Sequence, residues 1–500
     1  MTRKSDKSVN RRDFLAKTGQ GAAAVTAALT VASPAVVRAK GLNERLRLGM
    51  LATGDRVLGG LGPAILEIAK RNQNIEIASA CDVYKMNLEA FADQVKKSTG
   101  VAPKTTGDYR DVIADKSIDA VFVTTPDHWH AKMTLEALQS GKHVYCEKPM
   151  THTVEEAIAV MDAWKKSGLV MQVGVHATAD PRWREAYKFI RQGGIGKVIQ
   201  AQTHYYRNSS MGEWRYYKLT PEMNPKNVDW DMFLGHEWGL APKMPFDRAV
   251  FRQWRRYWPF GSGLMTTLFV HRLTHLLLAT GLRFPRRVVG AGGIFLELDG
   301  REVPDTATAV IDYNEGVQII VSASMCTSVR PLEICIRGHH GTVVFSGAPW
   351  SGDGFDFVPE RSQVTFDNSL KPQHITAQPA YGEKNVPIIE NFFEAIAKND
   401  PSMVFSPPDV GAAAIVGINL AADCYRYGKV YEWDNQARKV VESGPGYAKE
   451  WEQLSAERAA PRHVPGWDPI NKDPLFSQVR APSWQKLEGP WPDANTDPAR

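Results

Sequence analysis

Between residues 46 and 175 the chain alternates short apolar runs with longer segments of helical spacing, and this alternation restricts the fold most. Strands of four to eight residues that alternate with helices of ten to fifteen residues indicate βαβ units and a parallel sheet. The expected strands are 46–51, 75–82, 119–125, 143–146 and 169–175, and the expected helices are 63–72, 85–98, 130–140 and 153–167. We therefore predict an α/β domain with a doubly wound parallel sheet of the Rossmann type over residues 40–170.

The pattern changes after residue 175. A helix opens at Asp180-Pro181, and strand-like runs follow at 197–206, 286–296, 306–314, 317–325 and 332–347. Consecutive strands without intervening helices favour antiparallel pairing, and Asn314-Glu315-Gly316 suits a hairpin turn. We predict a C-terminal α+β domain over residues 171–445 with a large, mostly antiparallel open sheet. Because such a sheet leaves a face to cover, we expect a homo-oligomer, either a dimer or a tetramer.

Both ends of the chain differ from the body in composition. Residues 1–39 contain Asn10-Arg11-Arg12-Asp13-Phe14-Leu15, an Ala-rich apolar stretch over 21–37, and a small-residue cleavage context at Ala39. This resembles a twin-arginine (Tat) signal peptide, which predicts export to the periplasm or another extracytoplasmic space. A retained membrane anchor is the alternative, and we expect no stable membrane span after signal removal. Residues 446–500 are rich in proline and tryptophan and predict an extended tail.

The charge balance argues against a nucleic-acid partner. The chain has 60 Lys/Arg and 55 Asp/Glu residues, but seven of the basic and only two of the acidic residues lie within 1–39. The remaining chain therefore has no net formal charge, whereas binding to phosphates requires a basic surface. The five cysteines are scattered, which predicts buried thiols and neither a disulfide framework nor a metal site.

The first predicted strand leads into Ala52-Thr53-Gly54-Asp55-Arg56, where a dinucleotide-binding fold places its glycine-rich turn. Of the three glycines typical of that turn, only the central one is present, as Gly54. Ala52 and Val57 occupy the other two glycine positions. Further glycines at 59, 60 and 62 allow a longer loop. Asp82 ends the second strand, where an acidic group can accept hydrogen bonds from ribose hydroxyls and repel a 2′-phosphate. This arrangement favours NAD over NADP, although an unrelated strand–turn remains an alternative.

Two later segments complete the N-terminal pattern. Thr125-Pro126-Asp127-His128-Trp129-His130 follows the third predicted strand, where Asp127 also suits a helix N-cap, and Glu147-Lys148-Pro149 follows a buried strand. Together with Gly193-Gly194-Ile195-Gly196-Lys197-Val198, these motifs resemble the Gfo/Idh/MocA oxidoreductases over residues 45–435. The resemblance implies an NAD-dependent enzyme in which Lys148 reaches the nicotinamide and the substrate and is the first catalytic candidate. A lysine in such a place has a lowered pKa and can accept a hydroxyl proton. The cofactor-binding residues implied are Ala52, Thr53, Gly54, Asp55, Arg56, Asp82, Thr125, Pro126, His130, Glu147 and Lys148.

The substrate half departs from the family pattern. Members carry an aspartate and, four residues later, a histidine that helps to move the substrate proton. His271 matches the histidine, but Thr267 stands at the aspartate position and Thr274 at a later acidic position. A carboxylate would raise the basicity of the imidazole, whereas threonine only forms hydrogen bonds. His275 lies four residues after His271, yet this pair without a third ligand is weak evidence for a metal.

Aromatic residues make up about twice their chain-wide share between Trp183 and Phe260, and arginines are interleaved with them. Flat aromatic faces and polar groups suit polyol rings, although a core or a subunit interface uses the same residue types. The substrate-binding candidates are His176, Arg182, Tyr187, His204, Trp254, Thr267 and His271.

The sequence therefore predicts an exported, NAD-dependent oxidoreductase that acts on a secondary hydroxyl of a sugar, glycoside or polyol with a tightly bound cofactor. One alternative is an NAD-dependent glycosidase that uses transient oxidation at C3 followed by elimination. A catalytically degenerate sugar-binding or structural protein is a further alternative, suggested by Ala52, Val57 and Thr267.

Overall fold

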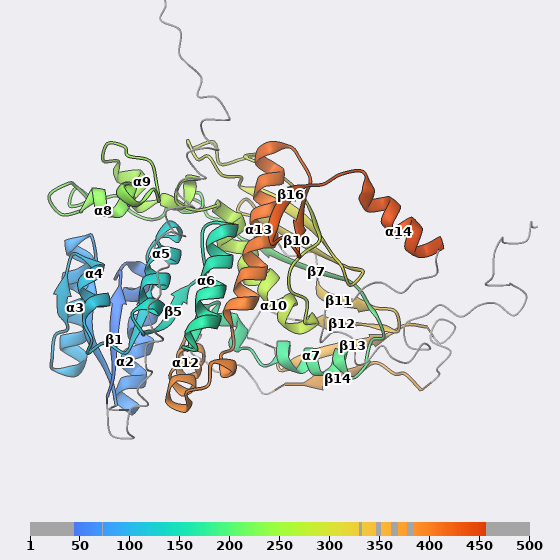
Figure 1. The fold of residues 1–500 in the computed structure, drawn as a ribbon, viewed down its shortest axis with the longest axis horizontal. Helices are drawn as coiled ribbons and strands as arrows, with labels where there is room; N and C mark the ends of the chain where they lie inside the picture. The colour runs from blue at the N-terminus through green and yellow to red at the C-terminus, as the bar shows by residue number, and fades with distance from the viewer. Residues whose placement is uncertain are drawn as a thin grey trace, which may run out of the picture.

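The structure is a computed structural model that describes residues 45–72, 74–329, 333–346, 352–361, 369–377 and 385–456. The first domain, coloured blue to cyan in Figure 1, lies beside a second domain built on a larger sheet. The predicted signal peptide at 1–39 and residues 457–500 of the predicted tail lie outside the described residues. No helix in the described ranges is both long and apolar enough to cross a membrane.

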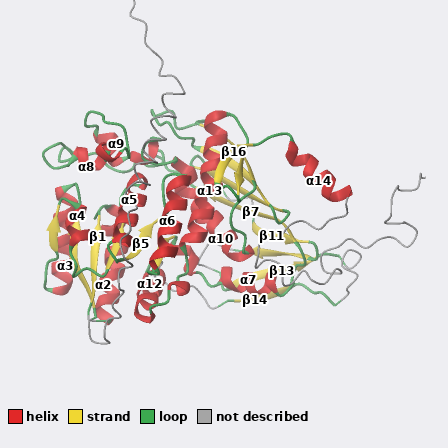
Figure 2. Ribbon diagram, in the orientation of Figure 1, coloured by secondary structure: helices red, strands yellow, loops and turns green. Residues whose placement is uncertain are grey.

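The first domain has a six-stranded parallel sheet in the order β3-β2-β1-β4-β5-β6, with helices on its two faces (Figure 2). Its strands are β1 (Leu46–Leu51), β2 (Ile75–Cys81), β3 (Lys104–Thr106), β4 (Ala120–Val123), β5 (His143–Glu147) and β6 (Met171–Gly174). Its helices are α2 (Gly62–Arg71), α3 (Lys85–Thr99), α4 (Tyr109–Ala114), α5 (Asp127–Gln139) and α6 (Val154–Ser167). This order confirms the doubly wound prediction. Strand β3 and helix α4 were not expected from the sequence, because both are too short for a periodic signal.

The boundary between the two domains differs from the prediction. Strand β6 belongs to the first sheet, so that sheet extends to Gly174, beyond the predicted limit at 170. In addition, helix α12 (Val386–Lys398) returns from the C-terminal part of the chain and packs on the first domain. Its Phe392 ring lies 5.8 Å from that of Phe122 and 5.9 Å from that of Tyr145. The first domain is therefore completed by a segment that is distant in sequence.

The second domain has a ten-stranded sheet in the order β14-β13-β12-β11-β7-β10-β9-β8-β15-β16. Its strands are β7 (Val198–Tyr206), β8 (Arg287–Gly293), β9 (Thr306–Tyr313), β10 (Val317–Ser324), β11 (Ile334–Gly338), β12 (Gly341–Phe345), β13 (Gly354–Pro359), β14 (Gln373–Thr376), β15 (Tyr431–Asp434) and β16 (Lys439–Glu442). Among its recorded pairings only that of β10 with β7 is parallel. This confirms the predicted large, mostly antiparallel sheet. The last four strands were not expected, because most of them are short.

The second domain also contains helices α7 (Arg182–Arg191), α10 (Val270–Thr280) and α13 (Pro408–Tyr427). Of these, α10 and α13 pack on one face of the sheet. The approach is close, because a Cβ atom at Gly290 would lie 2.5 Å from the carbonyl oxygen of Ala421 on α13. By contrast, Ile199, Val289 and Val358 on β7, β8 and β13 are exposed. Each of them alternates with a buried neighbour on its strand, so they mark the face opposite the helices.

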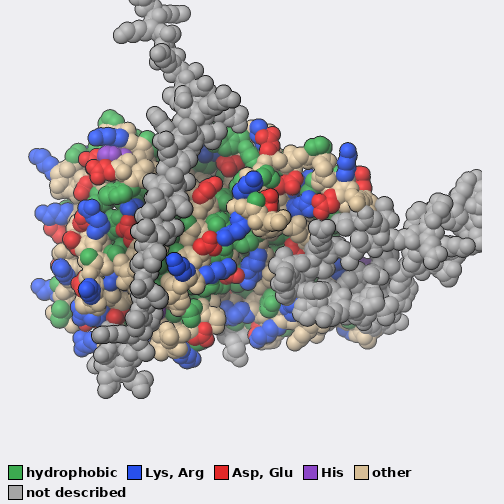
Figure 3. All heavy atoms as spheres, in the orientation of Figure 1, with side chains coloured by type: hydrophobic (Ala, Val, Ile, Leu, Met, Phe, Trp, Pro, Cys, Tyr) green, Lys and Arg blue, Asp and Glu red, His purple; other side chains and the backbone are tan. Residues whose placement is uncertain are grey.

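The first part of the predicted extended tail is helical instead. Helix α14 covers Gly446–Ala456. The guanidinium of Arg287 lies 3.7 Å from the centre of the Tyr447 ring, and Arg286 pairs with Glu450. These contacts, which the composition of the tail does not reveal, hold the helix against the start of β8. On the face shown in Figure 3, side chains of both charge signs are mixed.

Candidate active site

A cavity of about 410 Å³ lies between the two domains. On one side it is lined by residues that follow the carboxyl ends of β1, β2, β4 and β5. On the other side it is lined by residues between Arg207 and His271. In a doubly wound sheet with this strand order, the carboxyl edge beside β1 is where the direction of winding reverses and where ligands bind.

The turn after β1 adopts the backbone of a dinucleotide-binding loop without all its glycines. Ala52 has a φ of 77°, in the left-handed region that glycine usually occupies. Helical backbone begins at Asp55 and passes through a π-helical turn at Val57–Leu61 into α2. The expected longer loop is therefore wrong, because the additional glycines lie within the helix. Gly62 permits this packing, since a Cβ atom there would lie 2.9 Å from the Phe91 ring.

Asp82 lies directly after β2 and lines the cavity, as predicted for the ribose-binding acid. Its Oδ2 accepts hydrogen bonds from the backbone N–H of Thr53 (2.6 Å) and from the Thr53 hydroxyl (3.0 Å). Its Oδ1 accepts one from the backbone N–H of Tyr84 (2.8 Å). Burial raises the pKa of Asp82, while these hydrogen bonds act in the opposite direction. The carboxyl group is thus held rigidly at the cavity wall.

Lys148 follows β5 and lies between the two domains. Its Nζ donates a hydrogen bond to the backbone carbonyl of Thr267 at 3.5 Å. Burial lowers its pKa to about 8, and the nearby Arg255 guanidinium acts in the same direction, against Glu147 and Asp127. A lysine with this pKa changes protonation state near neutral pH and can accept or return a proton.

The preceding residue, Glu147, is buried and forms an ion pair with Arg56, whose Nε lies 2.6 Å from Oε1. The Glu147 carboxylate also accepts a hydrogen bond from the backbone N–H of Lys148 at 3.1 Å. Because Arg56 belongs to the first βα turn, this pair joins that turn to the end of β5. The ion pair therefore fixes these two neighbouring segments on one wall of the cavity.

His271 enters the cavity from the start of α10, after a π-helical turn at Met265–Phe269. Its ring lies 5.3 Å from that of His176, which also lines the cavity. Burial lowers the pKa of His271 well below its usual value, and Lys148 and His176 add to this effect. The imidazole is therefore neutral at physiological pH. His275 stacks on Trp183 at 4.6 Å, outside the cavity lining.

Residues 207–260 reach from the second domain over the first (upper left in Figure 1), where α8 (Trp230–Leu234) and α9 (Arg248–Arg252) lie. Tyr84 forms a β-bridge with Val228, and its ring lies 5.6 Å from that of Phe251. Arg252 pairs with Asp55 on the first βα turn at 2.7 Å. This segment therefore covers the part of the cavity next to Asp82.

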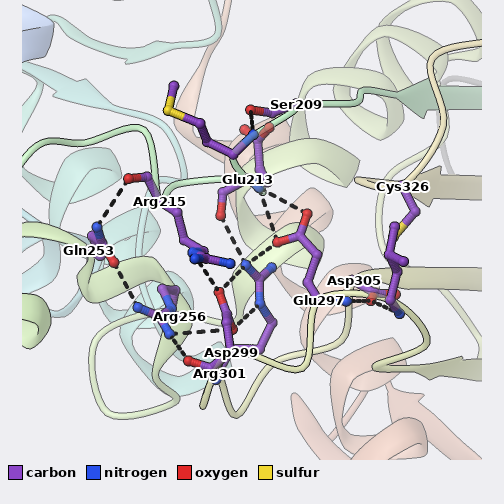
Figure 4. A network of polar contacts seen from close by, with 12 residues as sticks. Ser209, Glu213, Arg215, Gln253, Arg256, Glu297, Asp299, Arg301, Asp305 and Cys326 are labelled. Carbon is purple, nitrogen blue, oxygen red and sulfur yellow. Dashed lines mark hydrogen bonds and ion pairs between the residues drawn. The ribbon is translucent and has the colours of Figure 1, made fainter.

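A network of polar contacts supports the same wall of the cavity (Figure 4). Glu213 donates its backbone N–H to Glu297 at 2.9 Å and accepts, through its carbonyl, a hydrogen bond from Arg301 at 3.0 Å. Arg301 also pairs with Glu297 and Asp299. The next residue, Trp214, is buried in the cavity lining with a φ of 67°, which a bulky side chain rarely adopts. The network holds Trp214 in this strained conformation.

Most of the residues predicted from the sequence meet in this cavity. The cofactor-binding candidates in its lining are Ala52, Gly54, Asp55, Arg56, Asp82, Thr125, Pro126, Glu147 and Lys148, and the substrate-binding candidates are His176, Trp254, Thr267 and His271.

The other five predicted residues are not among those that line the cavity. Thr53 is buried against Asp82, and Tyr187 lies exposed on α7. Arg182 pairs with Asp180 at 2.7 Å, and the His204 ring lies 5.2 Å from that of Tyr206. His130 lies between two backbone carbonyls, with Nδ1 2.6 Å from that of Pro149 and Nε2 2.9 Å from that of Thr125. It therefore supports the two loops from behind the cavity.

Several lining residues were not identified as site residues from the sequence. They are Cys81, Val83, Asn87, Gly107, Tyr109, Thr124, Asp127, Trp129, Met133, Arg207, Trp214, Tyr216, Tyr217, Met232, Phe233, Phe251, Arg252 and Arg255. Many belong to the aromatic- and arginine-rich stretch, so that composition was the available signal. Composition could not distinguish them from core residues such as Trp183. Asp127 had been considered as a helix N-cap, but the N-cap of α5 is Pro126 and Asp127 is the first helical residue.

The residues present fit a dinucleotide. The left-handed backbone at Ala52 gives the first βα turn the bend that such loops require, and a helix begins immediately afterwards. Asp82 stands at the end of β2, where a ribose-binding acid belongs. Asp82, the first turn and Lys148 line one cavity, so that a single extended ligand in it would contact all three.

Comparisons with known proteins agree with this geometry. Residues 58–175 match the GFO/IDH/MocA oxidoreductase family, NAD-binding Rossmann fold, and residues 240–344 match the GFO/IDH/MocA C-terminal domain. The chain is 34% identical over 119 residues to levoglucosan dehydrogenase of Pseudarthrobacter phenanthrenivorans. This alignment covers 23% of this chain and 30% of that protein. It is also 27% identical over 185 residues to a glycosyl hydrolase family 109 protein of Shewanella baltica. That alignment covers 34% of this chain and 39% of the other protein.

Similarity of structure extends further than similarity of sequence. The solved structure of levoglucosan dehydrogenase with NADH and levoglucosan superposes with a TM-score of 0.55 at 20% identity, covering 80% of this chain and 99% of that one. The sequence alignments, in contrast, span only 30% to 55% of the curated relatives. The fold is therefore shared over almost the whole described chain, and the sequence likeness is concentrated in parts of it.

Proposed function

We propose that this protein is an NAD-dependent oxidoreductase acting on a secondary hydroxyl of a sugar, glycoside or polyol. The chain carries both the NAD-binding and the C-terminal domain of the GFO/IDH/MocA oxidoreductases. The observation that carries the proposal is the position of Lys148. Its amine, with a pKa of about 8, lines the same cavity as the first βα turn and Asp82 on one side and His271 on the other. The sugar-directed names of the relatives support the substrate class.

The chain's own residues account for binding and proton transfer. Ala52, Gly54, Asp82 and Thr125 would hold NAD, which supplies the hydride acceptor when bound. Lys148, in its neutral form, accepts the proton of the reacting hydroxyl group. His271 is neutral and offers a second hydrogen-bonding group to that hydroxyl.

The direct test is an assay of the purified protein with NAD and a panel of sugars, anhydrosugars, polyols and aryl glycosides. We expect at least one neutral sugar to produce NADH, measured by absorbance at 340 nm, in a stoichiometric single turnover. Failure of every member of the panel to reduce the cofactor or to be converted would contradict the proposal.

A redox-neutral glycosidase is the second candidate, and the likeness to a family 109 glycosyl hydrolase favours it. In that reaction a hydroxyl is oxidised, the aglycone is eliminated, water is added and the ketone is reduced, so the net change is hydrolysis. The same panel separates the two activities. Release of the aglycone without net formation of NADH indicates the glycosidase, and accumulation of NADH and a ketosugar indicates the dehydrogenase.

We also propose that the enzyme is exported by the Tat route as a homo-oligomer with NAD tightly bound. The twin arginines 11 and 12 support the route, and the exposed Ile199 and Val289 support contact between copies. We expect the wild-type protein in the periplasmic fraction, with bound NAD by mass spectrometry and a dimeric or tetrameric mass by light scattering. Replacing both arginines by lysine should leave the protein inside the cell. Equal export of that variant, or an exported pool without NAD, would contradict this proposal.

A further inference from the structure

Asp127 is a carboxylate in the cavity that the protein itself does not fully satisfy. Its side chain is only 4% exposed, and it lines the cavity between the domains. Its Oδ2 has no hydrogen-bond partner among the described residues. Asp127 is the first residue of helix α5, directly after the N-cap residue Pro126. A buried carboxylate oxygen without a donor costs free energy, so a ligand that brings a donor would stabilise it.

The surroundings of Asp127 come from both domains. The Thr266 side chain and the charges of His130, Arg255 and Lys148 act on the carboxyl group from nearby. Burial raises the pKa of Asp127, and these neighbours counteract that rise. The Gly261 backbone approaches closely, because a Cβ atom there would lie 2.9 Å from Oδ2. The carboxyl group is therefore held where the two domains meet.

The cavity lacks a carboxylate at the position where the family resemblance led us to expect one. That position is Thr267, whose backbone carbonyl accepts a hydrogen bond from Lys148. Asp127 lines the same cavity as Thr267 and His271, but it is carried by the N-terminal domain, as Lys148 is. A carboxylate accepts hydrogen bonds and donates none when ionised, so its ligand must supply a hydroxyl or amine hydrogen.

We propose that Asp127 binds a hydroxyl group of the substrate and so supplies from the N-terminal domain the carboxylate that position 267 lacks. The inference rests on the proposed function and deepens it, because it requires a substrate with a hydroxyl besides the one that reacts. A substrate with two or more neighbouring hydroxyls meets this requirement, whereas a simple secondary alcohol does not.

The test compares Asp127→Asn and Asp127→Ala with wild type, using the sugar that the panel identifies. We expect the KM for that sugar to rise about 10- to 100-fold, as for the loss of a hydrogen bond to a charged group. NADH binding, followed by fluorescence, should change less than about threefold. The melting temperature of the ligand-free Asp127→Asn protein should equal or exceed that of wild type, because an unsatisfied charge is removed. Asp93→Asn, which alters an exposed carboxylate on α3, is the matched control.

The outcomes separate this inference from the function on which it rests. If wild type converts no sugar in the panel, the proposed function itself fails. If wild type is active and the Asp127 variants keep its KM, or lose activity together with a lowered melting temperature, the role of Asp127 in substrate binding is wrong.

Discussion

Replacing Lys148 by alanine should lower the turnover of the sugar substrate by about 10²- to 10⁴-fold, the range typical of a lost general acid–base group. The reason is that the amine that accepts the proton is lost, and the lowered pKa of His271 makes its imidazole a weak replacement base. The affinity for NADH should change little, since Asp82 and the first βα turn remain in place. Steady-state kinetics and a fluorescence titration of NADH measure the two effects separately.

The pKa of Lys148 also predicts the direction in which the oxidation rate of the wild-type enzyme changes with pH. Lys148 is protonated below its pKa of about 8 and cannot accept a proton, so the oxidation rate should rise with pH and level off above that value. Lys148→Ala should lack this rise. Lys104→Ala, at an exposed position on β3, is the control and should behave as wild type. A Lys148→Ala enzyme with normal turnover would rule out Lys148 as the proton acceptor.

Replacing Arg56 by alanine should destabilise the cofactor-free protein by about 2 kcal/mol, less than for a fully buried ion pair because a third of the Arg56 side chain is exposed. The substitution leaves the buried Glu147 carboxylate without the partner that now lies 2.6 Å away. Breaking one side of a buried ion pair is costly because the remaining charge stays desolvated. The pKa of Glu147, which Arg56 now helps to hold below its usual value, should rise in the variant. Unfolding in urea, followed by circular dichroism, measures the loss of stability.

A double substitution distinguishes the ion pair from simple loss of packing. Glu147→Gln in the Arg56→Ala background removes the unpaired charge, so it should recover a large part of the lost stability. Recovery of none of it would mean that Arg56 stabilises the turn through its aliphatic part alone.

Much of the N-terminal domain could be predicted from the sequence because its strands and helices are regular in length. The apolar run of β1 and the capping box of Thr153 and Glu156 are local signals, and the structure contains both. The short strand β3 carries no such signal, since it has three residues, two of which are exposed. Helix α14 was missed for another reason, because its contacts with Arg286 and Arg287 come from residues distant in sequence.

The site could be predicted where a residue's position follows from a strand end. Asp82 and Lys148 each follow a strand of the parallel sheet, so their place at the carboxyl edge could be inferred without the structure. Asp127 also follows a strand end, that of β4, but its motif equally suited a helix N-cap, and Arg255 follows no strand of this sheet. Their proximity depends on how the segment 207–260 crosses from one domain to the other, and no local pattern encodes that crossing. The position of His130 between two backbone carbonyls cannot be read from its motif either.

The central claim is that NAD binds beside Lys148 in the cavity between the domains. A crystal structure of the protein grown with NAD tests it most directly. We predict electron density for the adenosine ribose at Asp82 and for the nicotinamide next to the Lys148 amine. A well-ordered cavity with no dinucleotide at saturating NAD, or a dinucleotide bound elsewhere on the protein, would contradict the account.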